Sequence, residues 1–207
     1  RGTLSPSMFN LSRYFSTLSL ALILAAGGVL GYFYHSLAVA QLVAMAEARN
    51  VAMTQVFRNT LWPRYGEFLR PVGSRDPEAL RADPQTARLH AEVTAQTRDT
   101  EVIKAKVYNR AGLTVYSSDA RQIGEDKSAN AGFRRALEGH AASELTHRNS
   151  FDAFEGMLSE LDVISSYVPI RGEGGAVEGV FELYQDVTPF LAYLRQTLWW
   201  IAGGVLA

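Results

Sequence analysis

The stretch EVIKAKVYNRAGLTVYSS, from Glu101 to Ser118, indicates that the middle of this chain forms a β-sheet. Its two halves, EVIKAKVYN and LTVYSS, are rich in the β-branched and aromatic residues that suit a pleated, half-buried surface. The segment NRAG at residues 109–112 joins them and ends in glycine, as tight turns often do. The stretch therefore predicts a β-hairpin.

Three more strands are predicted after this hairpin. The segment ASELTHR (Ala142–Arg148) is short and alternating, while DVISSYVPI (Asp162–Ile170) and AVEGVFELYQDV (Ala176–Val187) flank the glycine-rich turn RGEGG. Before them, NAGFRRALEGHA begins with Asn130, a good helix cap, and its pattern stops at Gly139. The sequence thus predicts five antiparallel strands and one short helix between the second and the third.

A long helix is predicted upstream of the sheet. The segment between the first apolar block and Pro63 contains neither proline nor glycine, and small or apolar residues recur near the helical period at Met45, Ala48, Ala52 and Val56. We expect this stripe to pack on the sheet or on a second copy of the chain. Downstream of it, Asp76-Pro77 and Asp83-Pro84 each combine an acidic cap with a first-turn proline, which predicts two short helices or a turn and a helix.

The first apolar block has the character of a membrane span. No Asp, Glu, Lys or Arg occurs from Tyr14 to Ala46, and a helix needs about 20 apolar residues to cross the hydrocarbon core. We predict a cytoplasmic segment over residues 1–14 and a transmembrane helix over residues 15–35. The alternative is a cleaved signal peptide, with Arg13 as its leader and the small-x-small triplet AVA at residues 38–40 as its cleavage site. The length of the block and its aromatic end, YFY, favour the span.

The chain ends in a second apolar segment, TLWWIAGGVLA. Trp199 and Trp200 open it, where a membrane interface would place amphipathic rings. We predict that residues 197–207 begin a second transmembrane helix; the alternative is a buried C-terminal helix of a soluble domain. Two spans would place residues 36–196 together on one side of the bilayer, and Arg13 favours a cytoplasmic N-terminus. The predicted location is the bacterial inner membrane, with residues 36–196 in the periplasm.

Composition argues against several functions. The 207 residues carry 20 Lys+Arg and 21 Asp+Glu, so no net field favours nucleic acid. There is no cysteine, which excludes disulfides and thiolate chemistry. The four histidines lie in different predicted elements without ligand spacing, and the glycines of RGEGG join two strands instead of opening a helix. We predict no metal, no cofactor and no enzymatic activity within these residues.

A ligand pocket is predicted on one face of the sheet. Along the last strand, Phe181 and Leu183 point to one face while Glu182, Tyr184 and Asp186 point to the other, because strand side chains alternate. If the apolar face meets the long helix, the polar face is free to line a pocket. Arginine with tyrosine suits a small carboxylate or an amino acid, because a guanidinium binds a carboxylate with two hydrogen bonds. The candidate ligand-binding residues are Tyr116, Arg121, Arg135, His147, Tyr167, Tyr184 and Asp186.

The order of these elements resembles that of the extracytoplasmic single Cache (PAS-like) sensor domains of bacterial transmembrane receptors. The segments that carry the resemblance are KVYNRAGLTVYSSD, IGEDKSANAGFRRALEG, ELTHR, SSYVPIR and GVFELYQDVTPFL. They span Lys106 to Leu191, and the long helix extends the likeness back to about Leu37. The resemblance implies an α+β fold in which a long helix, first transmembrane and then periplasmic, packs on a five-stranded antiparallel PAS-like sheet that leads into a second membrane helix.

The resemblance also implies a function. Such receptors are typically homodimers in which ligand binding shifts the membrane helices and so controls a cytoplasmic output module. We expect a non-enzymatic input domain whose output module, most simply a sensor histidine kinase, lies beyond Ala207. A diguanylate cyclase or a chemoreceptor is the alternative output. A secreted or singly anchored metabolite-binding protein is the alternative from another functional class.

Overall fold

The computed structural model describes residues 6–72, 76–154, 156–172 and 174–206. Residues 1–5 of the predicted cytoplasmic segment, and Ala207 of the predicted second span, lie outside the described residues. The helices are α1 (Pro6–Thr60), α2 (Trp62–Leu69), α3 (Pro77–Ala82), α4 (Pro84–Thr97), the 3₁₀ helix η1 (Ala120–Gln122), α5 (Ala131–Leu137) and α6 (Thr188–Leu206). The strands are β1 (Val102–Asn109), β2 (Thr114–Ser117), β3 (Ala142–Ala153), β4 (Gly156–Arg171) and β5 (Val177–Asp186).

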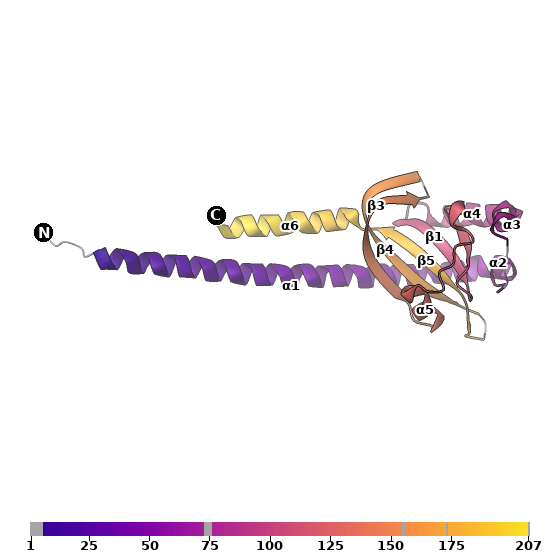
Figure 1. The fold of residues 1–207 in the computed structure, drawn as a ribbon, viewed down its shortest axis with the longest axis horizontal. Helices are drawn as coiled ribbons and strands as arrows, with labels where there is room; N and C mark the ends of the chain where they lie inside the picture. Colours follow the sequence, from indigo (N-terminus) through magenta and orange to yellow (C-terminus); the bar gives the residue numbers. More distant parts are fainter. Residues whose placement is uncertain (1–5, 73–75, 155, 173, 207) are drawn as a thin grey trace. The chain divides into compact units, whose positions relative to one another are not determined.

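The five strands form one sheet in the order β2-β1-β5-β4-β3, and every neighbouring pair is antiparallel (Figure 1). The first and last strands of the chain, β1 and β5, lie side by side at its centre. The predicted α+β class, the five antiparallel strands and the short helix between β2 and β3 are confirmed.

The geometry of the turn between β1 and β2 requires a glycine at its last position. The side-chain oxygen of Asn109 accepts hydrogen bonds from the backbone N–H groups of Ala111 and Leu113, at 3.0 and 3.1 Å. Gly112 has φ +88°, and a Cβ there would lie 2.6 Å from the backbone nitrogen of Ser128. A residue with a side chain would be strained by its backbone conformation and would also collide with the following loop.

Strands β3 and β4 are longer than predicted. The predicted strands end at Arg148 and begin at Asp162, whereas the hairpin continues through Ser150 paired with Ser159 to Ala153 paired with Gly156. Most side chains in this extension are exposed or only partly buried. Only Phe151 and Leu161 are buried among the described residues of this extension, so it lacks the regular apolar alternation that identifies strands in a sequence.

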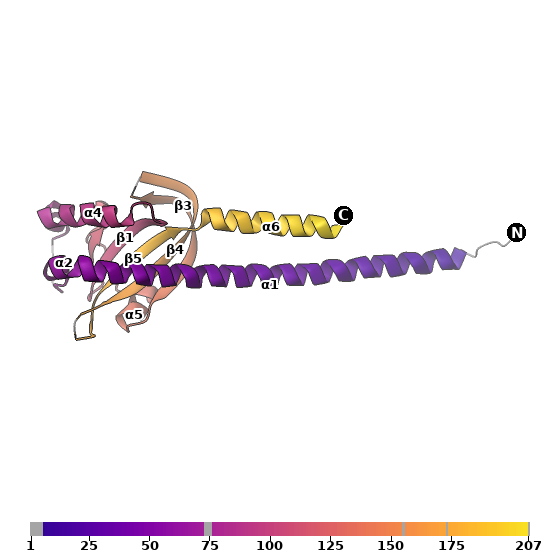
Figure 2. The same cartoon turned by 180° about the vertical axis from the view of Figure 1, so that it is seen from behind.

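The core lies between one face of the sheet and the helices that cover it (Figure 2). Phe57 near the end of α1 contacts Phe181 on β5, with ring centroids 5.3 Å apart. Leu183 belongs to the same buried cluster, as do Leu89 and Val93 of α4. Phe181 and Leu183 therefore share one face, as predicted, and the condition that this face meets the long helix is fulfilled.

The helices before the sheet begin where the sequence indicates. Asp76 accepts hydrogen bonds from the N–H groups of Glu78 and Ala79, and Asp83 accepts one from Gln85, so each acid caps a short helix. The long helix ends at Thr60, and Pro63 lies in the first turn of α2 instead of ending α1 itself.

The chain divides into two compact units, residues 42–191, and residues 1–41 with residues 192–207. The first unit contains the whole sheet. In the second unit, α1 supplies the one described helix that is long and apolar enough to cross a membrane, and its most apolar 18-residue window is 0% buried. Trp199 and Trp200 on α6 are also exposed.

Candidate functional site

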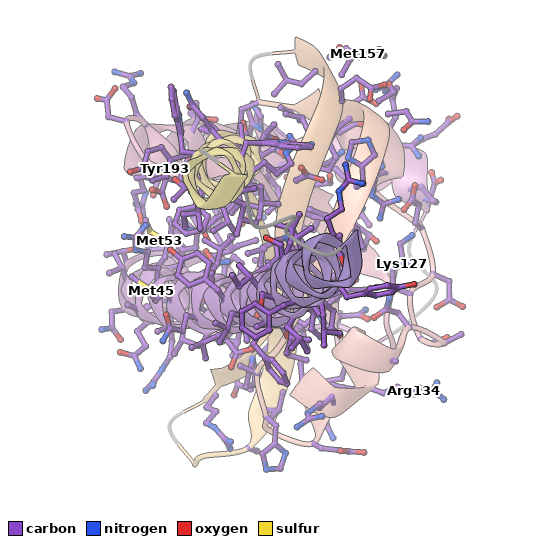
Figure 3. All side chains as sticks on the ribbon, turned by 90° about the vertical axis from the view of Figure 1, so that its left-hand side faces the viewer. Met45, Met53, Lys127, Arg134, Met157 and Tyr193 are labelled. Atoms are coloured by element: carbon purple, nitrogen blue, oxygen red, sulfur yellow. The ribbon has the colours of Figure 1, made fainter. Side chains whose placement is uncertain are left out.

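Two lysines stand on the sheet face that α1 does not cover. Lys104 and Lys106 alternate along β1, so both point to the same face. Across the β1–β5 pair, Lys106 lies opposite Glu182 and Lys104 lies opposite Tyr184. We call this side of the sheet the lysine face. Lys127 lies beside the lysine face, and Figure 3 shows Lys127 and Met53 of α1 on opposite sides of the sheet.

The ammonium groups of both lysines are buried, and each lies over an aromatic ring, with Nζ of Lys104 5.0 Å from the Phe151 centroid and Nζ of Lys106 5.9 Å from the Tyr184 centroid. Each lysine side chain is 4% exposed. The Nζ of Lys104 lies 3.8 Å from Oδ2 of Asp119, and the Nζ of Lys106 lies 3.8 Å from Oε2 of Glu125. Both acids belong to the segment that follows β2. A charge-assisted N–H···O hydrogen bond is about 2.7–2.9 Å long, so these carboxylates attract the lysines without binding them closely.

Both lysines of the lysine face have lowered pKa values. Burial lowers the pKa of Lys104, the neighbouring charge of Lys106 lowers it further, and Asp119 opposes the shift. Burial also lowers the pKa of Lys106, which Glu182 and Glu125 oppose. In both cases desolvation is the larger effect, so the carboxylates present do not fully compensate the two ammonium groups.

Glu182 is the buried acid of this face. It is 1% exposed, and its carboxylate accepts a hydrogen bond from the hydroxyl of Tyr108. The Tyr108 ring stacks on Tyr167, with centroids 6.3 Å apart. Burial, followed by the charge of Glu182, raises the pKa of Tyr108, Tyr167 and Tyr184, so the three phenols stay protonated and can donate hydrogen bonds.

The acids of the segment after β2 that face the two lysines also pair with more exposed basic residues. Arg121 donates two hydrogen bonds to Asp119, at 2.9 and 3.1 Å, and pairs with Asp152 at 2.8 Å. The hydrogen bonds from Arg121 lower the pKa of Asp119, so this acid remains ionised. Lys127 pairs with Glu125 at 3.1 Å in the same way. Both acids that face the buried lysines therefore also have an alternative partner on the more exposed side.

The structure brings some of the sequence-predicted residues together. Tyr167 and Tyr184 lie close enough to Glu182 for its charge to act on both hydroxyls, and Arg121 reaches the lysine face through Asp119. Arg135 is exposed on α5. Asp186 accepts a hydrogen bond from the backbone N–H of Thr188 at 2.8 Å and so caps α6.

Two predicted residues lie on the other side of the sheet. Tyr116 pairs with Val107, so its side chain enters the core beneath the helices, where its hydroxyl lies 3.3 Å from Nδ1 of His90. His147 pairs with Asp162 and thus points away from the lysine face, with its Nδ1 2.9 Å from Oδ1 of Asp162. Strand register decides which face a residue occupies, and a one-residue difference reverses it.

Sequence reasoning missed Lys104 and Lys106. The signal was present, because KAKVY places two lysines and a tyrosine at alternate positions on the same face as Glu182. Lysines in a strand usually indicate an exposed edge, and nothing in the sequence shows that β1 lies at the centre of the sheet.

No protein-family model and no curated protein matches the sequence. Solved structures do match. The periplasmic domain of RsbU from Chlamydia trachomatis is 15% identical with a TM-score of 0.48, and the alignment covers 91% of this chain and 59% of that one. The DcuS sensor domain of E. coli is 17% identical with a TM-score of 0.38, over 68% of this chain and 96% of that one. The extracellular domain of the putative histidine kinase rpHK1S-Z16 is 14% identical with a TM-score of 0.38, and the alignment covers 75% of this chain and 59% of that one.

The three matched structures are thus a periplasmic domain, a sensor domain and the extracellular domain of a putative histidine kinase. The chain spans about three fifths of the length of the matched RsbU chain, at 59%.

Proposed function

We propose that this chain is the extracytoplasmic input domain of a membrane receptor, and that its lysine face binds a small carboxylate or an amino acid. The observation that carries the proposal is the pair of buried lysines, Lys104 and Lys106, each 4% exposed and each 3.8 Å from its nearest carboxylate. Buried charges are normally paired and hydrogen-bonded. These two are paired at a longer distance, so a ligand carboxylate has two close contacts to gain.

Binding of such a ligand would exchange one set of ion pairs for another. A carboxylate that reaches both ammonium groups competes with Asp119 and Glu125, which then keep Arg121 and Lys127 as partners. The hydroxyls of Tyr167 and Tyr184 on the same face stay protonated and already hydrogen-bond to Glu182, so a ligand there would have to compete with this acid. The segment after β2 would therefore change position when the ligand binds, and the ligand's preference for one arrangement would supply the free energy of the signal.

The fold connects the lysine face to α6 over a short distance. Glu182 and Tyr184 belong to β5, which ends at Asp186, and Asp186 caps the start of α6. The backbone N–H of Asp162 on β4 also donates to the hydroxyl of Thr188 at 2.9 Å. A change in β5 or β4 is thus transmitted to the first turn of α6.

We further propose the topology around this input domain. Residues 15–35 span the inner membrane, residues 36–196 form the periplasmic sensor, and residues 197–207 begin the return span, with the receptor acting as a homodimer. The supporting observation is the exposed apolar length of α1. A sensor histidine kinase is the proposed output, with a diguanylate cyclase or a chemoreceptor as the alternatives.

Thermal unfolding of the 207-residue chain in lipid nanodiscs tests ligand binding. The panel contains small mono- and dicarboxylates, amino acids, and amines of equal size. A ligand at 100 times its dissociation constant stabilises the folded state by about 2.7 kcal/mol, which corresponds to a rise in Tm of several degrees. We expect at least one carboxylate or amino acid to produce this rise, and we expect the amines to have no effect.

Two variants locate the binding site. Lys106→Met keeps the aliphatic stem and removes the ammonium group, so it should abolish the rise in Tm. The control is Arg64→Met, which removes a 62% exposed charge on α2 that pairs with Glu92 and has no contact with the lysine face, and it should keep the rise. An equal rise in wild type and Lys106→Met, or stabilisation by amines alone, would refute binding of a carboxylate at the lysine face.

A further inference from the structure

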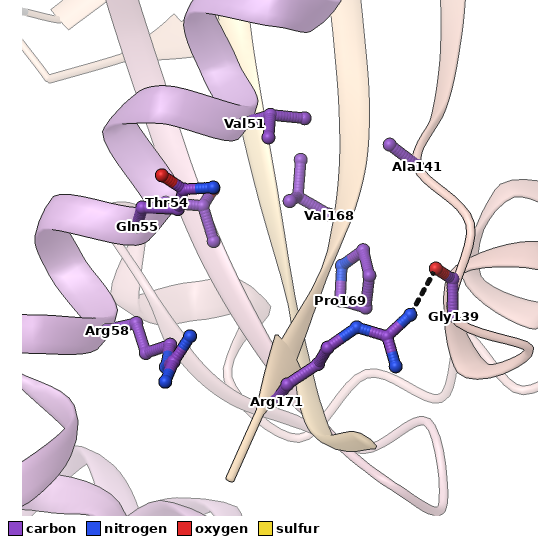
Figure 4. A pocket seen from close by; sticks show the side chains of 9 residues that line it. All are labelled: Val51, Thr54, Gln55, Arg58, Gly139, Ala141, Val168, Pro169 and Arg171. Atoms are coloured by element: carbon purple, nitrogen blue, oxygen red, sulfur yellow. Dashed lines mark hydrogen bonds between the residues drawn. The ribbon is translucent and has the colours of Figure 1, made fainter. Parts of the chain in front are cut away.

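We propose a second anion site, separate from the lysine face, in a groove between α1 and β4 that takes a carboxylate with a short apolar body. Figure 4 shows the groove. Its cavity volume is about 230 Å³, and its lining residues are Val51, Thr54, Gln55, Arg58, Gly139, Ala141, Val168, Pro169 and Arg171. It lies on the α1 side of the sheet, so a ligand there contacts neither buried lysine.

Two arginines line the groove, and the described part of the chain places no carboxylate beside them. Arg58 on α1 and Arg171 at the end of β4 are its charged lining residues, and no acidic residue is among the described residues that line it. Among the described residues, Arg58 has no ion-pair partner. The guanidinium of Arg171 donates to two backbone carbonyls, Gly139 at 2.7 Å and Gly175 at 3.1 Å, and pairs with no carboxylate among the residues that the structure describes. An anion is therefore the complementary ligand.

The backbone of Gly139 allows the Arg171 guanidinium to lie close to it. Gly139 has φ +91°, and a Cβ at this position would lie 2.5 Å from Nη2 of Arg171. Only glycine permits both this backbone conformation and the close approach of the guanidinium. Its two hydrogen bonds to backbone carbonyls hold the Arg171 guanidinium beside the groove, which reduces the entropy lost on binding.

A buried hydroxyl on the groove supplies an independent indication. Thr54 is 2% exposed, lines the groove, and its Oγ1 has no hydrogen-bond partner among the described residues. Buried polar groups nearly always have a partner, so an unpaired hydroxyl needs a reason. A carboxylate oxygen in the groove would accept its hydrogen bond.

The shape of the groove favours a small molecule over a peptide strand. Strand β3 pairs with β4 only as far as Tyr167, which leaves the edge of β4 beyond it open. Pro169 lies in that open edge and lacks the N–H group that an added strand would need. The apolar lining residues Val51 and Val168 suit a short hydrocarbon body, and the volume is below the roughly 300–1,000 Å³ of sites for drug-sized ligands.

Hexanoate is the probe that tests the site in the 207-residue chain in nanodiscs. We expect hexanoate to shift the ¹³C-methyl resonances of Val51 and Val168, and hexylamine, which has a similar length and the opposite charge, to leave them unchanged. Arg58→Gln and Arg171→Gln should each weaken hexanoate binding about tenfold, since each removes a charge-assisted hydrogen bond. Arg134→Gln, an exposed substitution on α5 outside the groove, is the matched control and should leave the affinity unchanged.

The outcomes separate this site from the lysine face and from self-association. Lys106→Met should bind hexanoate in the groove as wild type does. Unmoved Val51 and Val168 resonances, or unchanged affinity in both arginine variants, would overturn the proposal. It would equally be overturned if Arg58→Gln altered dimerisation in sedimentation velocity while hexanoate shifted nothing, because a second copy of the chain would then occupy the groove.

Discussion

Lys104 and Asp119 form an ion pair in which Nζ and Oδ2 are 3.8 Å apart, although the two side chains are only 4% and 10% exposed. Such burial removes most of the hydration of both charges, and the distance prevents a strong hydrogen bond from replacing it. Backbone hydrogen bonds, such as that from the Ser118 N–H to the Ala105 carbonyl at 2.9 Å, also join the segment after β2 to the sheet. A competing anion could therefore replace the ion pair without detaching the segment.

Tyr108→Phe should destabilise the protein. The Tyr108 hydroxyl donates to Glu182, and its loss leaves a buried carboxylate with one hydrogen bond fewer. We expect the free energy of unfolding to fall by about 1–3 kcal/mol. The matched control is Tyr193→Phe, at a side chain that is 69% exposed, which should change it by less than about 0.5 kcal/mol. Equal values for the two variants, measured by chemical unfolding, would show that the bond to Glu182 contributes nothing.

Gly132→Ala should also be destabilising, against the usual preference of helices for alanine. Alanine normally stabilises a helix by about 0.5–1 kcal/mol relative to glycine. Here the new Cβ would lie 2.3 Å from the Tyr167 ring, which is itself stacked on Tyr108 and cannot move freely. Overpacking of this kind costs about 1–3 kcal/mol and should exceed the helix preference.

The control for this overpacking is Gly174→Ala, because a Cβ at Gly174 meets nothing within 4 Å. The change in Tm should be small for Gly174→Ala and a clear decrease for Gly132→Ala. A stabilised Gly132→Ala variant would mean that α5 does not rest on Tyr167.

Thr54→Val should raise the free energy of unfolding, whereas Thr97→Val should lower it. Both threonines are buried in helices, at 2% and 5% exposure, but the Thr97 hydroxyl donates to the carbonyl of Val93 at 2.9 Å while the Thr54 hydroxyl has no partner among the described residues. Removal of the unpaired hydroxyl should stabilise the protein by about 1 kcal/mol, and removal of the paired one should cost about as much. Thermal unfolding measures both. Loss of stability in Thr54→Val would indicate a hydrogen bond that the structure lacks.

His147 should titrate above the ordinary histidine range. The hydrogen bond with Asp162 raises its pKa, and Glu160, 3.5 Å away on the other ring nitrogen, adds to the effect. Because the folded-state pKa is the higher one, the stability that His147 contributes is present at pH values below the unfolded pKa of about 6.5. It is lost as the pH rises through the folded-state pKa.

Histidine NMR titration tests this assignment directly. Asp162→Asn should return the pKa of His147 toward its ordinary value, and Glu160→Gln should lower it less, since Asp162 makes the larger contribution. A wild-type pKa at or below about 6.5 would contradict the geometry of the β3–β4 hairpin.

The sequence predicted most of the fold because its elements carry strong local signals. The turn NRAG, the caps Asp76 and Asp83, and the alternation of Phe181 and Leu183 each have one simple structural solution. The candidate site was harder to predict, since it depends on register between strands that are distant in the chain. Tyr116 and His147 were grouped with Tyr167 by residue type, but their strand partners place them on the opposite face. The burial of Lys104 and Lys106, on which the proposed binding site depends, comes from their contacts with β5 and with the segment after β2. The sequence does not reveal these contacts.

The central claim is that Lys104 and Lys106 bind the ligand's carboxylate, and the pKa of each lysine tests it most directly. With ¹³Cε-labelled lysine in the 207-residue chain, NMR titration should show both pKa values below the ordinary value, because burial lowers them. Addition of the carboxylate that raises Tm most should then raise both pKa values, since a bound anion favours the charged ammonium. Binding of that carboxylate with both lysine pKa values unchanged would contradict the account.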